Sequence, residues 1–196
     1  VNENVRSAVS QTRGEVLGWQ GQLLRVFYHS CCGGRTEDLA RAWGGKPKQT
    51  PGPLRGVKDP WCRGTPNYTW SAYFTWSDLM SAIQEKVDLP GPLTSLKIGH
   101  RDIAGYVLNF TARAGRTSVE VDSSDLRRSL GAGELKSTRI RSLILKKNGV
   151  EFLGGGSGHG VGLCQWGAKL QALKGRSYEK ILHFYFPGST LSVVTQ

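Results

Sequence analysis

The chain has 196 residues, of which 38% are hydrophobic, and its formal net charge at pH 7 is +11. This length and composition exclude a disordered polymer and predict a folded core, organised as one domain over residues 1–196, with two small domains as the alternative. No apolar run approaches the roughly 20 residues of a membrane span, so no span is predicted. Val1 opens no signal peptide, and we expect a processed or truncated chain.

The residue types favour strands over helices. The 26 glycines exceed average usage, and helical periodicity is scarce. We therefore predict an α+β fold, mainly antiparallel β with several short helices.

The positive charge comes from 26 Lys and Arg against 15 Asp and Glu, spread along the chain. The densest basic spots are only pairs, such as Arg127–Arg128 and Lys146–Lys147. Basic surfaces attract polyanions, but the sequence holds no helix-turn-helix, zinc-finger or RNA-recognition signature. We predict no nucleic-acid partner and attribute the charge to a solvated surface or to attraction for an anionic cell-wall polymer.

The first third of the chain is predicted to begin with strands. Apolar and polar residues alternate over residues 5–12 and 15–20, and an apolar run covers 23–29, which predicts a meander of three short strands. Thr36 is the expected N-cap of a short helix. Residues 44–68 hold five Pro and five Gly and are predicted to form a surface loop, long enough to be functional or pinned.

The remainder mixes strands and helices. The predicted strands cover 94–102, 105–122 and 138–155, with a hairpin turn at Asn148–Gly149. An amphipathic helix is expected from Ser77 to Pro90, and a single capped helical turn within 122–131. Two further helices are expected at 164–174, before Gly175, and from Ser177 onward.

The chain has four cysteines, Cys31, Cys32, Cys62 and Cys164, and no CxxC pair. Vicinal Cys31 and Cys32 cannot easily pair with each other because of disulfide geometry. We predict a disulfide between Cys32 and Cys62, which implies an oxidising, extracytoplasmic compartment. The alternative is a mixed zinc site assembled from His29, Cys31 or Cys32, Cys62, His159 and Cys164.

The stretch GGGSGHGVGLCQWGA, residues 154–168, combines a glycine-rich loop with a helix start. It resembles a phosphate cradle, but it lacks the GxxxxGK[ST] pattern and a surrounding βαβ unit. His159 and Cys164 form a catalytic pair only if the loop folds back, and the favoured interpretation of Cys164 is a small buried hydrophobe. Glycines beside a His in this stretch and in HSCCGGRT let a bulky substrate approach the backbone. Tryptophans near these stretches offer sugar-stacking surface: Trp43, Trp61, Trp70, Trp76 and Trp166.

Four segments carry a family resemblance: HSCCGGRTEDLARAWGG, LRGVKDPWCRGTPNYTW, DLRRSLGAGELKST and the run from GGGSGHGVGLCQWGA to FPGSTL. In order and spacing they resemble the C-terminal two thirds of the stage II sporulation protein D and LytB amidase-enhancer family. The resemblance implies action on bacterial peptidoglycan. Its sporulation members are lytic transglycosylases that cut denuded glycan strands and leave 1,6-anhydro-muramyl ends, and its LytB-type members enhance cell-wall amidases.

The sequence departs from the family in one respect. The resemblance places the catalytic glutamate, and in some members a Cys/His zinc motif, in an upstream segment like E...WP.EALKAQAVAARTY, which this sequence lacks. Three explanations are open for the missing segment: the sequence is a fragment, it is a cleavage product with an associated partner, or it is a divergent protein without the acid. Glu37 and Asp38 lie near the HSCCGG motif, but their favoured interpretation is that they face a helix N-terminus.

We therefore predict that HSCCGG and GHGVGLCQWGA meet to line one groove for glycan strands. The expected substrate contacts are His29, Ser30, Gly33, Gly34, Thr36, His159, Gly160 and Gln165. His159 is expected to hydrogen-bond sugar or to orient the upstream glutamate. We predict no cofactor, zinc being the alternative, and an extracytoplasmic location in the cell envelope or outside it. The alternative function is a non-catalytic peptidoglycan-binding module that enhances an N-acetylmuramoyl-L-alanine amidase.

Overall fold

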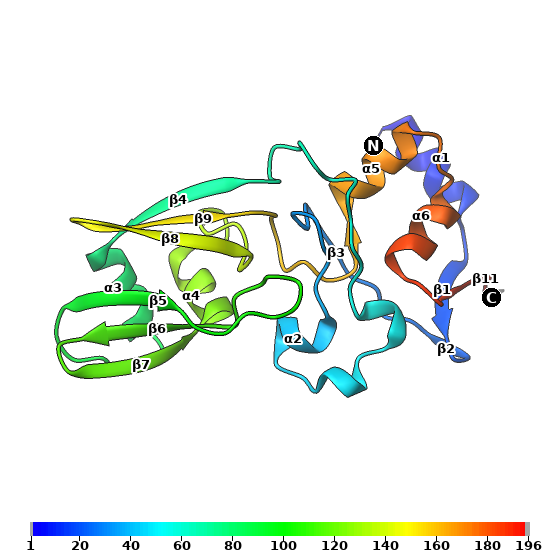
Figure 1. Ribbon diagram of the computed structural model, residues 1–196. Helices are drawn as coiled ribbons and strands as arrows, with labels where there is room; N and C mark the ends of the chain where they lie inside the picture. Colours follow the sequence, from blue (N-terminus) through cyan, green and yellow to red (C-terminus); the bar gives the residue numbers. More distant parts are fainter. Residues whose placement is uncertain (1, 195–196) are drawn as a thin grey trace.

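The computed structural model describes residues 2–194 (Figure 1). The helices are α1 (Glu3–Gln11), α2 (Leu39–Trp43), α3 (Trp76–Gln84), α4 (Ser123–Leu130), α5 (Gln165–Leu173) and α6 (Tyr178–Tyr185), with 3-10 turns at Pro47–Gln49 and Gly52–Leu54. The strands are β1 (Glu15–Trp19), β2 (Gln22–Leu23), β3 (Tyr28–His29), β4 (Trp70–Thr75), β5 (Leu93–Ile98), β6 (Asn109–Ala114), β7 (Thr117–Asp122), β8 (Ile140–Lys146), β9 (Gly149–Gly154), β10 (Leu163–Cys164) and β11 (Thr190–Val193). The predicted α+β class is confirmed.

The strands form small, mainly antiparallel sheets. Three of them are three-stranded, with the orders β4-β9-β8, β5-β6-β7 and β11-β1-β2. The predicted hairpin joins β8 to β9, but its turn lies one residue earlier than expected, at Lys147–Asn148, and Gly149 pairs with Lys146. The exception is a short parallel pair, in which Cys164 of β10 lies opposite His29 of β3. This pair brings the two glycine-containing motifs side by side.

Buried side chains form two separate clusters. The larger one packs α3 and α4 against the β4-β9-β8 and β5-β6-β7 sheets and includes Phe110 and Phe152. The smaller one lies around β1, α5 and α6 and includes Tyr185 and the four cysteines. In Figure 1 these two parts form opposite ends of the molecule, with α2 and β3 between them.

The amino-terminal prediction is wrong: residues 3–11 form helix α1. Val5, Ala8 and Val9 stand at positions i, i+3 and i+4, which is helical spacing, whereas only Val5 and Val9 fit alternation. The Asn2 side chain caps the helix by accepting from the Asn4 backbone N–H. The predicted third strand of the meander is also displaced, because β3 pairs with β10 rather than with β2.

The short helix α2 begins two residues later than predicted. Its N-cap is Asp38, whose carboxylate accepts from the backbone N–H groups of Ala40 and Arg41. Thr36 instead accepts from the Val57 backbone N–H at 2.7 Å and thereby ties the loop that follows α2. The expected helical turn after Asp122 is a two-turn helix, α4.

The other predicted elements are confirmed. Residues 44–68 form an irregular loop with two 3-10 turns. Helix α3 is present, but it starts from a Thr75 capping box rather than from Ser77 and ends at Gln84, before the predicted end at Pro90. Gly175 and Ser177 separate α5 from α6 as expected. Within residues 2–194, none of the helices has the length and apolar character needed to cross a bilayer.

Candidate functional site

A groove of about 800 Å³ lies between the two buried clusters. One wall is α2 with the glycines that follow it, and the opposite wall is the first part of α4 with the segment Tyr106–Leu108. The glycine loop reaches the groove through Gly158 and His159. The groove is open to solvent, and it draws residues from five separate parts of the chain.

The two motifs meet as predicted. Cys31 and Ser157 exchange two backbone hydrogen bonds of 3.1 and 2.7 Å, and the Glu37 backbone N–H donates to the Gly160 carbonyl at 2.8 Å. Gly156, at φ +82°, lies so close that an added Cβ would come within 2.8 Å of the Cys31 carbonyl oxygen. Glycine is needed here because the two loops pack backbone against backbone.

Trp43 is the main aromatic surface of the groove. Its side chain is 52% exposed. The ring centroid lies 5.0 Å from that of His159 and 4.9 Å from that of Phe27. These neighbours hold the indole in place while one part of it faces solvent, which is the arrangement needed to stack on a sugar ring.

His159 is neutral at pH 7, and its ring orientation is fixed. Its Nδ1 accepts from the Val161 backbone N–H at 3.1 Å, so Nε2 carries the proton. Burial lowers its pKa. His29 lies behind it, with 5.8 Å between ring centroids. Burial lowers the pKa of His29 to about 4, and its Nδ1 donates to the Val161 carbonyl at 3.1 Å.

Cationic side chains line the groove from both α4 and α2. Arg127 and Arg128 both line the groove from α4, and Arg41 lines it from α2. Arg127 is held rigidly, since its guanidinium donates to the carbonyls of Leu135 and Lys136 at 2.8 and 3.0 Å. Burial lowers its pKa from the ordinary value of arginine. Arg128 forms an ion pair with Asp125. The groove therefore presents hydrogen-bond donors in defined positions.

Glu37 lies at the base of the groove and is only 2% exposed. Its Oε1 accepts from the Asp38 backbone N–H at 2.7 Å. Burial, and then hydrogen bonding to Asp102, raises the pKa of Glu37 to about 9. The Asp102 Oδ1 is occupied by the backbone N–H groups of Ala104 and Tyr106. Glu37 is therefore a neutral acid at pH 7 that joins the HSCCGGRT segment to the loop before β6.

Of the eight predicted substrate contacts, His159 is the one found among the described residues that line the groove. His29 and Thr36 are 4% and 1% exposed and hold backbone in place. Gly33, Gly34 and Gly160 have positive φ and serve close packing. Ser30 accepts from the Trp166 backbone N–H, and Gln165 is exposed at the start of α5. Their contact with a substrate stays a prediction.

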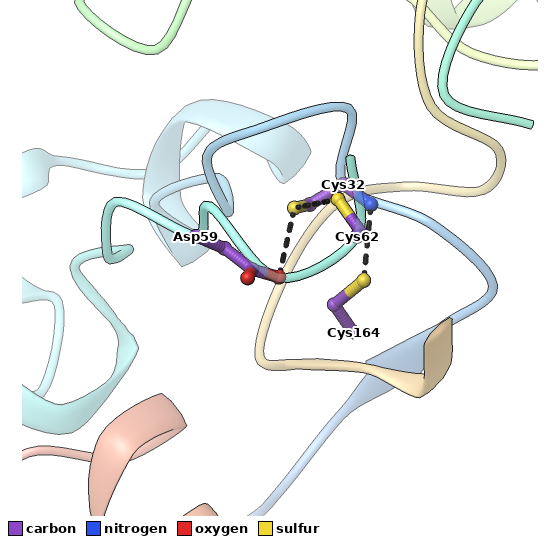
Figure 2. Close-up of side chains that lie close together, drawn as sticks. All are labelled: Cys32, Asp59, Cys62 and Cys164. Atoms are coloured by element: carbon purple, nitrogen blue, oxygen red, sulfur yellow. Dashed lines mark hydrogen bonds between the residues drawn. The ribbon is translucent and has the colours of Figure 1, made fainter. Parts of the chain in front are cut away.

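The cysteines gather in the smaller buried cluster (Figure 2). The sulfurs of Cys32 and Cys62 are 3.4 Å apart and unbonded in this structure, against about 2.05 Å in a disulfide, so their pairing stays a prediction. Hydrogen bonds from neighbouring thiols lower the pKa of Cys62, and those that Cys164 makes raise its pKa. Cys164 is fully buried, as its interpretation as a small hydrophobe predicts.

Sequence reasoning missed two groups of residues. Asp59 joins the cysteines, and Arg127 lines the groove, although neither stands in a motif that predicts these positions. The available signal was weak: Arg127 belongs to one of the two densest basic pairs, Arg127–Arg128.

Comparison with known proteins supports the motifs. The chain is 28% identical to stage II sporulation protein D of Bacillus subtilis over 195 residues, which is 97% of this chain and 51% of that protein. It is 29% identical to the amidase enhancer of the same organism, over 97% of this chain and 33% of that protein. These similarities extend over almost the whole chain and support its resemblance to the family of stage II sporulation protein D and the amidase enhancer.

A further similar protein has no assigned function, and the search of family models found no match. An uncharacterized protein of Brachyspira hyodysenteriae is 27% identical over 96% of this chain and 48% of its own length. No family model matches the chain. The chain thus spans about half the length of stage II sporulation protein D and a third of the amidase enhancer.

Proposed function

We propose that the groove binds a glycan strand of peptidoglycan, in a protein that cleaves such strands as a lytic transglycosylase. The observation that carries the proposal is the half-exposed Trp43, fixed by His159 and faced by Arg127 and Arg128. An aromatic face with fixed hydrogen-bond donors around it is the chemistry that recognises sugar rings and their hydroxyl and acyl groups.

In the proposed reaction a carboxylic acid protonates the glycosidic oxygen, and the bond from that oxygen to the muramyl C1 breaks. The muramyl 6-hydroxyl then attacks C1, and its proton returns to the same carboxylate. A 1,6-anhydro sugar is released without water. The acid is the family's glutamate, in a segment outside this sequence. Glu37 is not assigned this role because its carboxyl is buried and hydrogen-bonded within the fold.

The chain's own residues position the strand. Trp43 stacks on a sugar ring, and the Arg127 guanidinium, held by backbone carbonyls, fixes one end of the groove. The net charge of +11 attracts the anionic wall polymer. The proposed partners are glycan strands, the segment that carries the glutamate and, through the family, a cell-wall amidase. The proposed location is extracytoplasmic.

Trp43→Ala is expected to weaken the binding of denuded glycan strands by about tenfold or more, because stacking and burial of an indole contribute on the order of 1–2 kcal/mol. The measurement is a fluorescence titration of the purified chain with strands freed of stem peptides. Tyr73→Ala is the matched control, since Tyr73 is 50% exposed on β4 and lies outside the groove. Equal affinity of the two variants would contradict the proposal.

His159→Ala, made in the full-length protein, is expected to lower the rate of anhydro-muramyl product release far more than it lowers the free energy of unfolding. The ring is half-buried and makes one backbone hydrogen bond, so its loss costs little stability. Trp43 loses its support at the same time. Mass spectrometry measures the rate of product release, and thermal unfolding measures stability. If the rate and the stability fall in parallel, His159 has no direct role in the reaction.

The second candidate function is a non-catalytic module that activates an amidase. The observation that favours it is the similarity to the protein named amidase enhancer. It predicts retention on denuded strands, faster amidase turnover on mixing, and no anhydro-muramyl ends even with the full-length protein. A lytic transglycosylase produces such ends, so one product analysis separates the two candidate functions.

A further inference from the structure

The cysteine cluster comprises Cys32, Cys62 and Cys164 together with Asp59. One sulfur or carboxylate oxygen from each of these four residues lies within 4.8 Å of all the others. Figure 2 shows the side chains pointing toward one another from three separate segments of the chain. All four residues are fully buried. The cluster lies outside the groove and takes no part in the function proposed above.

The spacing of these atoms resembles the edges of a metal site. Cys32 Sγ lies 3.4 Å from Cys62 Sγ and 3.2 Å from an Asp59 carboxylate oxygen. In a tetrahedral site with Zn–S bonds of about 2.3 Å, neighbouring ligand atoms are separated by roughly 3.8 Å. Small side-chain movements therefore place all four atoms around one ion without moving the backbone.

The backbone around the cluster is arranged for thiolates. The Gly34 N–H donates to Cys32 Sγ, and the N–H groups of Cys32 and Gly167 donate to Cys164 Sγ, all at 3.3 Å. Cys164 is moreover the N-cap of α5, where the helix dipole favours negative charge. Neither feature is needed by a disulfide, whose sulfurs carry no charge, whereas metal thiolates are tuned by such donors.

The carboxylate of Asp59 is held in place for the same purpose. It accepts from the Tyr185 hydroxyl and from the Trp61 backbone N–H, each at 2.8 Å. These two donors orient the group toward the sulfurs, as outer-sphere partners orient metal ligands. Together with Cys32, Cys62 and Cys164, Asp59 brings the ligand count to the four of a closed structural site.

We propose that Cys32, Cys62, Cys164 and Asp59 bind one zinc ion as a closed structural site. This differs from the mixed cysteine and histidine site considered from the sequence, because His29 and His159 pair with each other beside Trp43. It also lies in residues other than the upstream Cys/His motif that the family resemblance describes. The ion ties the HSCCGG segment, the 44–68 loop and the start of α5 together.

Metal content tests the site directly. The protein purified without chelators or reductant is expected to contain about one zinc per chain by elemental mass spectrometry, and Cys62→Ser is expected to retain less than a tenth of it. Replacement of the zinc by Co²⁺ is expected to give the visible absorption of tetrahedral thiolate coordination. The proposal would be overturned if wild-type protein contained no zinc and its mass were lower by two hydrogens for each disulfide, because the cysteines would then be cross-linked.

The choice of ligands has its own controls. Cys31 is equally buried, but its sulfur contacts the Thr65 hydroxyl at 3.6 Å and is not among the four grouped atoms. Cys31→Ser is therefore expected to keep the zinc, and Asp59→Asn to lose most of it. The opposite pattern would overturn the assignment of Asp59.

A measurement on the wild-type protein covers the case in which Cys62→Ser does not fold. Removal of zinc by a strong chelator under reducing conditions is expected to lower the unfolding temperature, and added Zn²⁺ is expected to restore it. An unchanged unfolding temperature would contradict a structural site. Glycan binding by the zinc-loaded protein is measured separately, so failure of the zinc proposal and failure of the glycan proposal are distinguishable.

Discussion

Gly160→Ala is expected to destabilise the protein by more than about 3 kcal/mol. The residue has φ +81°, which an alanine adopts at a cost, and an added Cβ would lie 2.2 Å from the buried hydroxyl of Tyr106. Tyr106 is 3% exposed and hydrogen-bonds the Cys32 carbonyl, so it has no space to retreat. Denaturant unfolding of the two proteins measures the loss.

Gly175→Ala isolates the steric part of this loss. Gly175 has nearly the same φ, +77°, but nothing lies within 4 Å of an added Cβ. The Gly175→Ala variant is expected to lose only about 1 kcal/mol of unfolding free energy, which is the cost of the left-handed backbone alone. If both variants lose the same free energy of unfolding, the methyl group added at Gly160 does not clash with Tyr106.

This comparison explains why GHGVG is glycine-rich. The loop packs against the backbone of HSCCGG, as the hydrogen bonds between Cys31 and Ser157 show, and it reaches the groove through His159. The sequence predicted that the two segments meet, because both combine a histidine with glycines. It did not predict that most of those glycines serve packing rather than ligand contact, since the neighbours that require them, such as Tyr106, are distant in sequence.

The elements with strong local signals were predictable. The β8 to β9 hairpin has Asn148 in its turn and Gly149 directly after it, and Gly175 separates α5 from α6. Helix α1 was not predictable, because Val5 and Val9 are exposed and no buried face enforces one period. The N-cap of α2 was missed because Thr36 and Asp38 are both good caps, and a tertiary contact to Val57 decides between them.

The candidate sites were predictable only in part. The motifs locate His159 and the cysteines, but Arg127 reaches the groove from α4 of the other buried cluster, and Asp59 reaches the cysteines from the 44–68 loop. Both depend on packing between elements far apart in sequence. The pKa of Glu37 has the same origin, since burial between two segments and the nearby Asp102 raise it.

Glu37→Gln is expected to make the protein more stable at alkaline pH and to flatten the fall of stability with pH. The folded protein holds the Glu37 proton up to a pKa of about 9, whereas an unfolded chain releases it near the ordinary glutamate pKa of 4.5. The folded state therefore binds more protons between these values, and the contribution of Glu37 to the free energy of unfolding falls as the pH rises. Below pH 4.5 the contribution is fully present, and above about 9 its loss is complete.

The free energy of unfolding of wild type is expected to fall, relative to that of Glu37→Gln, by about 1 kcal/mol per pH unit. The difference between the two proteins therefore grows by roughly 3 kcal/mol from pH 5 to pH 8. Glutamine reproduces the neutral acid, since its oxygen accepts from the Asp38 N–H and its amide donates to Asp102. Urea unfolding at several pH values measures the difference, and exposed Glu134→Gln is the control expected to run parallel to wild type. A Glu37→Gln curve parallel to wild type would mean that Glu37 is ionised in the fold. Asp102 and Glu37 would then need a cation between them, and the base of the groove would carry negative charge toward the bound strand.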